Sequence, residues 1–255
     1  MITIGIDSGT QRTKAVIIRD EEIISMALAR TNFNANEVAE EMIRQLLDKS
    51  NLNMSVVEKI YTTGVGSKTI QVGDGHVNEI MAAAAGVCRL MPECRCVLDL
   101  GAERNRVIRL DDNHKVQGYE VNDKCASGSG TFIENMARVL ETSTEEFGSL
   151  ALHHKKNISL SAQCVVFVES EVISLIHQNE DSSDIAWGIL TGAASHVITL
   201  INRFGKVKNI GAIGGLTLNP GLMEALKKEM GQDICVVPYS EYVSAYGAAL
   251  LAAQI

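Results

Sequence analysis

One hairpin pattern occurs twice in the chain, and it limits the possible folds more than any other feature. Residues 2–20 read ITIGIDSGTQRTKAVIIRD, and residues 97–112 read VLDLGAERNRVIRLDD. Each copy has an apolar strand, a tight turn with an Asp and a Gly two residues later, and a second strand. Aligning the copies matches five positions: Asp7 with Asp99, Gly9 with Gly101, Lys14 with Arg106, Val16 with Ile108 and Asp20 with Asp112. The repeat favours an internal duplication.

The hydrophobic periodicity of the remaining chain predicts helices alternating with short strands. Asn219 before Pro220 is a typical helix start, and Gly231 is a typical helix end. We expect helices at 36–49, at 128–141, at 184–204 with Asp184 as the N-cap, from Pro220 to Gly231, and at 246–253. We expect short strands at 96–100, 158–160, 209–213 and 234–237. Because no linker rich in Pro, Ser or Gly occurs, any two domains must pack closely.

The charge of the chain excludes some partners. The 23 Lys and Arg residues are outnumbered by 31 Asp and Glu residues, which gives a net charge of −8. An acidic chain has no electrostatic footprint for nucleic acid or an anionic membrane. No apolar run approaches the length of a membrane-spanning helix, about 20 residues, and the N-terminus reads as a strand, not as a signal peptide. We therefore expect a cytoplasmic protein whose six cysteines are buried thiols, metal ligands or redox groups rather than disulfides.

The two Asp-x-Gly turns suit phosphate binding, because a Gly-rich turn between strands points several backbone N–H groups at one spot. The first turn adds hydroxyls and a cation, and the acid of each turn, Asp7 or Asp99, can hold Mg²⁺ through water. A plain hairpin turn has a similar composition. The pairing of the turns, together with Gly214-Gly215 after a strand, favours phosphate binding. The chain has no Walker-type phosphate loop and no Rossmann fingerprint.

Two cysteines stand just before helical patterns, where the partial positive charge of a helix N-terminus stabilises a thiolate or an anionic cluster. Cys125 lies in NDKCASGSG, and Cys164 lies in SAQCVVFVESEV. Two thiolates per chain cannot complete a four-ligand iron–sulfur site, but a two-fold dimer with the site on its axis could. From spacing alone, two buried thiols at helix starts is the favoured interpretation.

The ordered motifs resemble a known superfamily. A phosphate turn, the Gly64-Val65-Gly66 bend, a second phosphate turn and a Gly-Gly adenosine turn look like the sugar kinase, heat-shock chaperone and actin superfamily. Within it, NDKCASGSGTFIE, SAQCVVFVESEVISL and GIDSGTQRTKAVI resemble the activator ATPases of 2-hydroxyacyl-CoA dehydratases, which are grouped with the ATPase subunits of benzoyl-CoA reductase. The resemblance implies an α/β protein of the actin-like ATPase fold. Two similar subdomains, residues 1–121 with 240–255 and residues 122–239, would flank a nucleotide cleft.

The family couples ATP to one-electron transfer, so the resemblance implies a homodimer with a bridging [4Fe–4S] cluster on Cys125 and Cys164. It also implies ATP or ADP with Mg²⁺, a flavodoxin or ferredoxin as donor, and a dehydratase-like or related reductase partner that contains iron–sulfur clusters. We expect Asp7, Asp99 and Glu103 to act in catalysis. The expected nucleotide-binding residues are Gly9, Thr10, Gln11, Arg12, Thr13, Lys14, Gly101, Ala102, Gly214 and Gly215.

The chain departs from the family in two places. The usual second phosphate motif, Asp-Ile-Gly-Gly-Gln-Asp, is replaced by DLGAER, which ends in Ala102, Glu103 and Arg104. The late family run Gln-Tyr-Asn-Gly-Ala-Leu is replaced by EYVSAY at 241–246. We expect slow hydrolysis with nucleotide binding retained. Two alternatives are a small-molecule kinase of the same superfamily and a nucleotide-gated regulator that does not hydrolyse ATP.

The remaining candidates have plainer interpretations. We expect Cys88, Cys94 and Cys96 to be structural thiols, with Cys96 buried in its strand, because their spacing lacks the paired C-x₂-C pattern of zinc sites. Cys235, in the apolar run DICVV, is predicted to be core. His76 and residues 153–156 are expected in loops. Glu79 matches a family acid near the Mg²⁺ side of the cleft, and a surface helix charge is the alternative.

Overall fold

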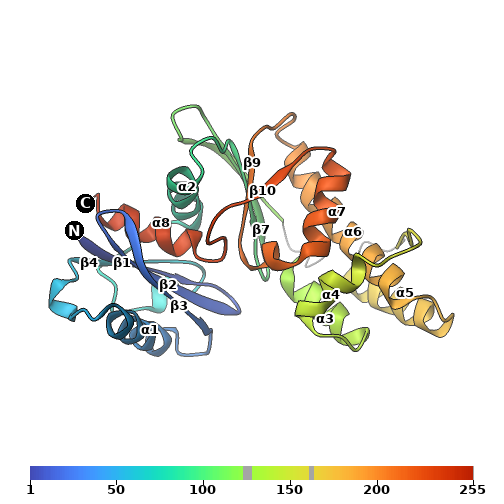
Figure 1. Ribbon diagram of the computed structural model, residues 1–255, viewed down its shortest axis with the longest axis horizontal. Coiled ribbons are helices and arrows are strands. Elements are labelled where there is room, and N and C mark those ends of the chain that lie inside the picture. Colours follow the sequence, from blue (N-terminus) through green and yellow to red (C-terminus); the bar gives the residue numbers. More distant parts are fainter. Residues whose placement is uncertain (123–127, 161–163, 255) are drawn as a thin grey trace. The chain divides into compact units, whose positions relative to one another are not determined.

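The computed structural model describes residues 1–122, 128–160 and 164–254. It is an α/β protein with two five-stranded sheets (Figure 1). Contacts divide the chain into two compact units. Unit 1 consists of Met1–Val97, Leu110–Gly118 and Val237–Ile255, and unit 2 consists of Leu98–Arg109 and Tyr119–Val236. Each unit therefore combines segments that are distant in the sequence.

The two sheets have the same strand order. The first runs β3-β2-β1-β4-β5 and the second, from its far edge, β8-β7-β6-β9-β10. The strands of the first sheet are β1 (Ile2–Ser8), β2 (Arg12–Arg19), β3 (Glu22–Arg30), β4 (Lys59–Thr63) and β5 (Gly75–His76). Those of the second are β6 (Cys96–Leu100), β7 (Asn105–Leu110), β8 (Val116–Val121), β9 (Ile210–Ile213) and β10 (Ile234–Val236). Because β6 to β10 take the places of β1 to β5 one for one, the topology supports the duplication that the hairpin repeat predicted.

Helices cover both faces of the first sheet, because alternate residues of its strands are apolar on opposite faces. Ile4 and Ile6 of β1 pack with Met42 of α1 (Ala35–Ser50) on one face. Val16 and Ile18 of β2 pack with residues of α8 (Val243–Ala252) on the other. Helix α2 (Glu79–Leu90) lies against α8. Short 3-10 helices at Met54–Val56 and Ser67–Thr69 complete unit 1.

Unit 2 adds a group of helices to the second sheet: α3 (Gly130–Val139), α4 (Thr144–Ala151), α5 (Val165–His177), α6 (Ser182–Asn202) and α7 (Pro220–Met230), with a 3-10 helix at Gly215–Leu218. Helix α6 packs against α4 and α7. Contrary to the expectation that no apolar run approaches the length of a membrane-spanning helix, α6 could cross a membrane by length and composition, but 67% of its most apolar window is buried. It is thus placed like the core helix of a soluble protein.

Local signals predicted most element ends correctly. Helices α1 and α3 and strands β9 and β10 differ from prediction by one or two residues at an end, whereas α8 begins earlier, at Val243. Asn219 caps α7 by accepting a hydrogen bond from the Leu222 N–H, and Gly231 ends it with a positive φ of 63°. Both termini of α7 are as predicted.

Several predictions are wrong, and three of them concern unit 2. The N-cap of α6 is Asp181, which accepts from the Ser183 N–H, while Asp184 in the first turn accepts the backbone N–H groups of Lys155 and Lys156. Residues 158–160 form no strand, because no neighbouring strand pairs with them. Cys235 is exposed, since β10 is an edge strand.

Candidate functional site

The first turn places its acid and one cation together. Asp7 ends β1 and stands opposite Lys14 of β2 in the antiparallel register. The Lys14 Nζ lies 3.3 Å from Asp7 Oδ2, and both side chains are largely buried, with exposed fractions of 14% and 15%. Lys14 is therefore held by Asp7 rather than extended into solvent.

The second cation of this turn is also paired. Arg12 NH1 lies 3.8 Å from Glu241 Oε1, and Glu241 lies just before α8. The phenol of the neighbouring Tyr242 lies close to the same charges. Burial raises its pKa, the charge of Glu241 raises the pKa further, and the charges of Arg12 and Lys14 lower it. Tyr242 is thus neutral at pH 7. Sequence reasoning noted 241–246 only as a departure from the family, and gave no sign of this ion pair.

The second turn repeats the arrangement in unit 2. Arg106 NH1 lies 2.8 Å from Asp99 Oδ2, and each side chain is 11% exposed. The separation of seven residues equals that of Asp7 and Lys14. The duplication therefore preserves an acid–cation pair in each predicted phosphate turn.

A glycine follows the strand beside each turn. Gly64 after β4 has φ 88°, and Gly214 after β9 has φ 93°. A Cβ atom at Gly64 would overlap the Asp7 carboxylate and the Ser8 carbonyl, and one at Gly214 would overlap the Leu100 carbonyl. Only glycine combines this backbone conformation with so close an approach. Each central strand therefore ends against the backbone of a second Gly-rich loop.

Two buried hydroxyls near Asp7 have no partner among the described residues. Ser8 and Thr63 are fully buried, and neither Ser8 Oγ nor Thr63 Oγ1 makes a hydrogen bond. Thr63 stands beside Asp7 in the parallel register of β1 and β4. Since buried polar atoms in native structures nearly always have a partner, an unpaired hydroxyl points to a missing ligand, ion or water. A carboxylate, hydroxyls and a lysine are the groups that hydrated Mg²⁺ and phosphate require.

The remaining nucleotide candidates lie in unit 2. Gly101 and Ala102 are half-buried in the second turn, and Glu103 and Arg104 are exposed. The turn is closed by a 3.2 Å hydrogen bond from the Gly101 N–H to the Arg104 carbonyl. Gly214-Gly215 lead from β9 into the 3-10 helix that precedes α7. The residues predicted in one unit are thus brought together locally, as one loop group at each central strand.

The predicted cluster ligands are described in part. Cys164 is the N-cap residue of α5, as predicted, but it is exposed, so the interpretation from spacing as a buried thiol is wrong for this cysteine. The first turn of α5 also exposes Val166 and Phe167, at 68% and 67%. Cys125 lies outside the described residues. Within those residues no three His, Cys, Asp or Glu side chains are grouped as a metal site, and a cluster ligated by two cysteines from each chain would not form such a group.

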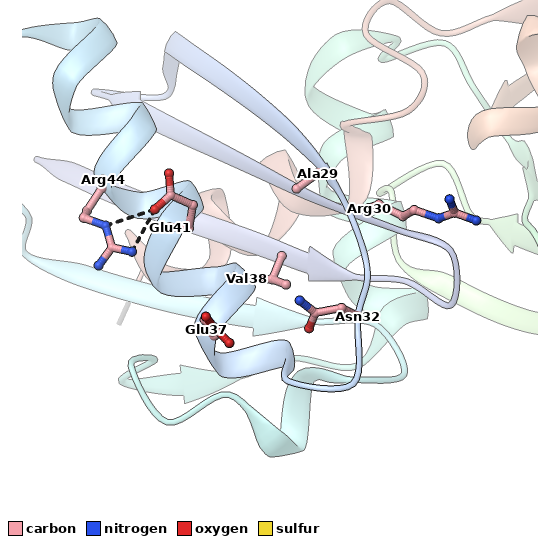
Figure 2. Close-up of a pocket in the computed structure, with 7 residues that line it drawn as sticks. All are labelled: Ala29, Arg30, Asn32, Glu37, Val38, Glu41 and Arg44. Atoms are coloured by element: carbon pink, nitrogen blue, oxygen red, sulfur yellow. Dashed lines mark hydrogen bonds and ion pairs between the residues drawn. The ribbon is translucent and has the colours of Figure 1, made fainter.

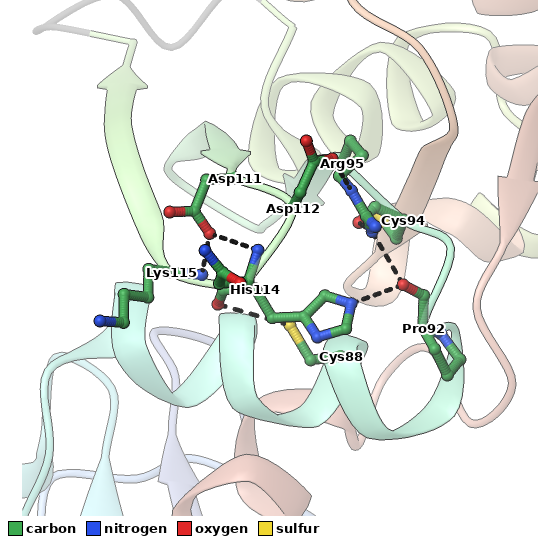
Figure 3. Close-up of polar contacts among 9 residues, drawn as sticks. Cys88, Pro92, Cys94, Arg95, Asp111, Asp112, His114 and Lys115 are labelled. Carbon is green, nitrogen blue, oxygen red and sulfur yellow. Dashed lines mark hydrogen bonds and ion pairs between the residues drawn. The ribbon is translucent and has the colours of Figure 1, made fainter.

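Two other cysteines, Cys88 and Cys94, lie around the end of α2 (Figure 3), and Cys96 begins β6. Cys94 and Cys96 are buried, and burial raises the pKa of the Cys88 thiol. Cys94 Sγ donates to the Cys96 carbonyl at 3.2 Å, and Cys88 Sγ lies 3.8 Å from the His114 carbonyl. These contacts support the structural role expected for the three thiols.

The histidine and acid candidates lie in β5 and at the start of α2. His76 is exposed in the two-residue strand β5 rather than in a loop. Glu79 is the first residue of α2, capped by Asn78, and is half-buried.

A separate hollow of about 220 Å³ lies between β3 and α1 (Figure 2). It contains none of the predicted site residues, and Arg44 and Glu41 on its wall form an ion pair at 2.8 Å.

Comparison with known proteins identifies the family. A model of the BadF/BadG/BcrA/BcrD ATPase family matches residues 4–252. The structure of the activator of the 2-hydroxyisocaproyl-CoA dehydratase from Clostridium difficile with bound ADPNP is 32% identical, with a TM-score of 0.94, over 100% of this chain and 95% of that one. Component A of the (R)-2-hydroxyglutaryl-CoA dehydratase of Acidaminococcus fermentans is 32% identical, with a TM-score of 0.95, over 100% and 98% of the two chains.

One of the subunits of the benzoyl-CoA reductase of Thauera aromatica is 35% identical, over 98% of this chain and 92% of the relative. The actin-like ATPase fold expected from the sequence is confirmed. Full-length matches of this kind, together with the duplicated turns, establish that the chain belongs to the BadF/BadG/BcrA/BcrD ATPase family.

Proposed function

We propose that the protein is an ATP-dependent one-electron-transfer activator: a homodimer that holds a shared [4Fe–4S] cluster and delivers electrons to a reductase partner. The exposed thiol of Cys164 at the N-terminus of α5 is the observation that carries this proposal. A cysteine ligand there lies at the positive end of the helix dipole, which favours an anionic cluster, and it is accessible to a second copy. Cys125 would supply the other thiolate of each chain, and the cluster would supply the one-electron redox step.

The nucleotide would be held by both turns. The N–H groups of residues 9–14, and of Gly101 and Ala102, are proposed to bind phosphates, and Gly214-Gly215 the adenosine. Asp7 and Asp99 would hold Mg²⁺ through water, with the unpaired hydroxyl of Thr63 beside Asp7. Glu103, next to the second turn, is the proposed third catalytic residue. The bound ADPNP in the Clostridium difficile relative supports a nucleotide site in this family.

The surface of α5 supports a homodimer. Beyond Cys164, the helix exposes four large apolar side chains: Val166, Phe167, Ile173 and Ile176. Apolar side chains gathered on one helix are typical of an interface core. A two-fold axis beside the N-terminus of α5 would bring four thiolates together from two chains.

The partner is proposed from the relatives. These are activators of 2-hydroxyacyl-CoA dehydratases and a component of benzoyl-CoA reductase, so we propose a dehydratase-like or related iron–sulfur reductase as the acceptor. A flavodoxin or ferredoxin in the reducing cytoplasm would be the donor. With a net charge of −8, neither nucleic acid nor an anionic membrane is a proposed partner.

Metal analysis of the anaerobically purified protein tests the proposal. We expect a brown homodimer with about one four-iron cluster per dimer, since two thiolates per chain require two chains. Cys125→Ala and Cys164→Ala should each abolish the visible absorption. Cys235→Ala is the matched control, because this thiol is also exposed in unit 2 and should leave the absorption unchanged. A full cluster in either of the first two variants contradicts the ligand assignment.

A second candidate function is a nucleotide-gated regulator that does not hydrolyse ATP. It is favoured by the second turn, where the exposed Glu103 and Arg104 replace the Gln and acid of the usual motif. Such a regulator would bind nucleotide and be colourless with both cysteines intact. The metal analysis above therefore separates the two functions.

A further inference from the structure

The side chain of Asn105 connects the second turn to the residues on either side of Cys125 in the sequence. Asn105 begins β7 and is 1% exposed. Its Oδ1 accepts from the Gly101 N–H at 3.2 Å, and its Nδ2 donates to the Gly128 carbonyl at 2.8 Å. Its own backbone N–H donates to Asn122 Oδ1 at 2.7 Å. One buried residue thus contacts the turn and both flanks of the cysteine segment.

The start of α3 is attached to the same turn. The Gly130 N–H donates to the Gly101 carbonyl at 3.0 Å, and the Thr131 N–H donates to the Ala102 carbonyl at 2.8 Å. The Thr131 hydroxyl donates to that carbonyl as well, at 2.9 Å. Because these bonds use the carbonyl groups of Gly101 and Ala102, a displacement of the turn must displace the start of α3 or break them.

The residue that corresponds to Asn105 in the first hairpin makes different contacts. At the same offset, Thr13 occupies the place of Asn105 in unit 1, and its hydroxyl contacts the Thr31 hydroxyl at 2.9 Å, just beyond the neighbouring strand. The shorter side chain reaches the first turn through Thr31, whose hydroxyl donates to the Gly9 carbonyl at 2.8 Å. The longer amide in unit 2 reaches both the turn and the segment that precedes α3.

We propose that Asn105 is a positioning residue that transmits the nucleotide state of the second turn to the Gly128 carbonyl and the start of α3, which follow Cys125 in the sequence. The inference rests on the proposed function, in which Gly101 and Ala102 bind phosphate and Cys125 binds the cluster. Phosphate bound at the turn would compete for the Gly101 N–H that Asn105 Oδ1 accepts. The hydrogen bond from Asn105 Nδ2 to the Gly128 carbonyl would then change. Coupling of this kind requires contacts that differ between two states, and one shared buried amide provides them.

Thiol alkylation in the cluster-free protein tests the inference without relying on activity. The rate of Cys125 alkylation is measured by peptide mass analysis with and without Mg-ADP. In the wild type, Mg-ADP should change the rate about fivefold or more, the lower end of typical coupling. Asn105→Asp, which keeps the shape but loses the Nδ2 donor, and Asn105→Thr, the residue of the other hairpin, should abolish the change. Both should bind Mg-ADP with a Kd within about threefold of the wild type, as expected when coupling and binding are separable.

Two further variants keep the test decisive. Ser195→Ala removes a side-chain bond between α6 and α7, to Glu229 at 2.7 Å, and should leave the response intact. Thr131→Val removes the hydroxyl bond to the Ala102 carbonyl and should weaken the effect of Mg-ADP on Cys125 alkylation. This variant tests the coupling if the Asn105 variants do not fold.

The possible failures are distinguishable. A wild type that binds Mg-ADP without a change at Cys125 overturns the inference, as do Asn105 variants that respond like the wild type. A wild type that binds no adenine nucleotide overturns the proposed function itself.

Discussion

At the residue scale, the cations of each predicted phosphate turn are already paired with carboxylates of the protein. Lys14 is paired with Asp7, Arg106 with Asp99, and Arg12 with Glu241. A phosphate must therefore compete with carboxylates for these cations. Of the three acids, Glu241 is the one that replaces an uncharged Gln of the family motif. It is thus an added competitor.

Removing the charge of Glu241 should strengthen nucleotide binding. In Glu241→Gln, Arg12 loses its carboxylate partner and becomes available to phosphate, and one negative charge leaves the site. We expect the Kd for Mg-ADP to fall about threefold, since an ion pair of this exposure contributes at most about 1 kcal/mol. Titration with a fluorescent ADP analogue measures the effect. Glu22→Gln, which removes one of the two carboxylates paired with Arg89 on the surface of the same unit, is the control, and an equal Kd in the two variants would contradict the prediction.

The altered second turn should limit hydrolysis rather than binding. Glu103 adds negative charge beside the proposed triphosphate, and Arg104 stands where the family has an acid. Loss of one well-placed polar group costs roughly 2.7–4 kcal/mol of transition-state stabilisation, and two changes in one loop need not be additive. Replacing Ala102, Glu103 and Arg104 with Gly, Gln and Asp should raise anaerobic ATP turnover by about tenfold or more. An unchanged rate, with a wild type as fast as other family members, would show that Arg104 is not the obstacle.

At the level of elements, the sequence predicted what depends on neighbours along the chain. The hairpins, the caps of α7 and the start of α5 at Cys164 are determined by residues within a few positions of each other. Failures occurred where distant segments decide the outcome. The apolar alternation of 158–160 has no partner strand, and Cys235 is exposed because β10 lies at an edge. The Arg12–Glu241 pair joins the two ends of the chain, so no local pattern could indicate it.

Asp184 shows how such a distant contact affects stability. Its carboxylate accepts the Lys155 and Lys156 N–H groups at 2.6 and 2.9 Å, and these two bonds lower its pKa. A lowered pKa stabilises the fold above the ordinary value of about 3.9, and the contribution is lost as the pH falls through the folded-state value.

Asp184→Ala should therefore lower the thermal midpoint at pH 7, where the carboxylate is charged, and the difference from the wild type should narrow below about pH 3.9. Thermal unfolding followed by circular dichroism at several pH values measures this. Asp48→Ala, at the end of α1, is the control. A difference that stays constant down to acid pH would mean that the charge of Asp184 is not involved.

At the scale of the whole molecule, two copies of one sheet topology carry different additions. Unit 1 keeps a sheet covered by helices on both faces, whereas unit 2 carries α3 to α7 and both predicted cluster cysteines. The second copy thus combines a predicted phosphate turn with the proposed electron-transfer surface. The first copy provides the other predicted phosphate turn.

The proposed dimer gives the last prediction. If α5 forms the two-fold interface, a charge in its exposed first turn must be desolvated on association, so Phe167→Glu should produce monomers in sedimentation experiments. Since each chain supplies only two thiolates, the monomer should also lack the visible absorption of the cluster although Cys125 and Cys164 are intact. Phe33→Glu is the matched control, because Phe33 is fully exposed in unit 1 and should leave a coloured dimer. A coloured dimer of Phe167→Glu would place the interface elsewhere, while a colourless dimer would separate dimerisation from cluster binding and contradict a cluster shared across α5.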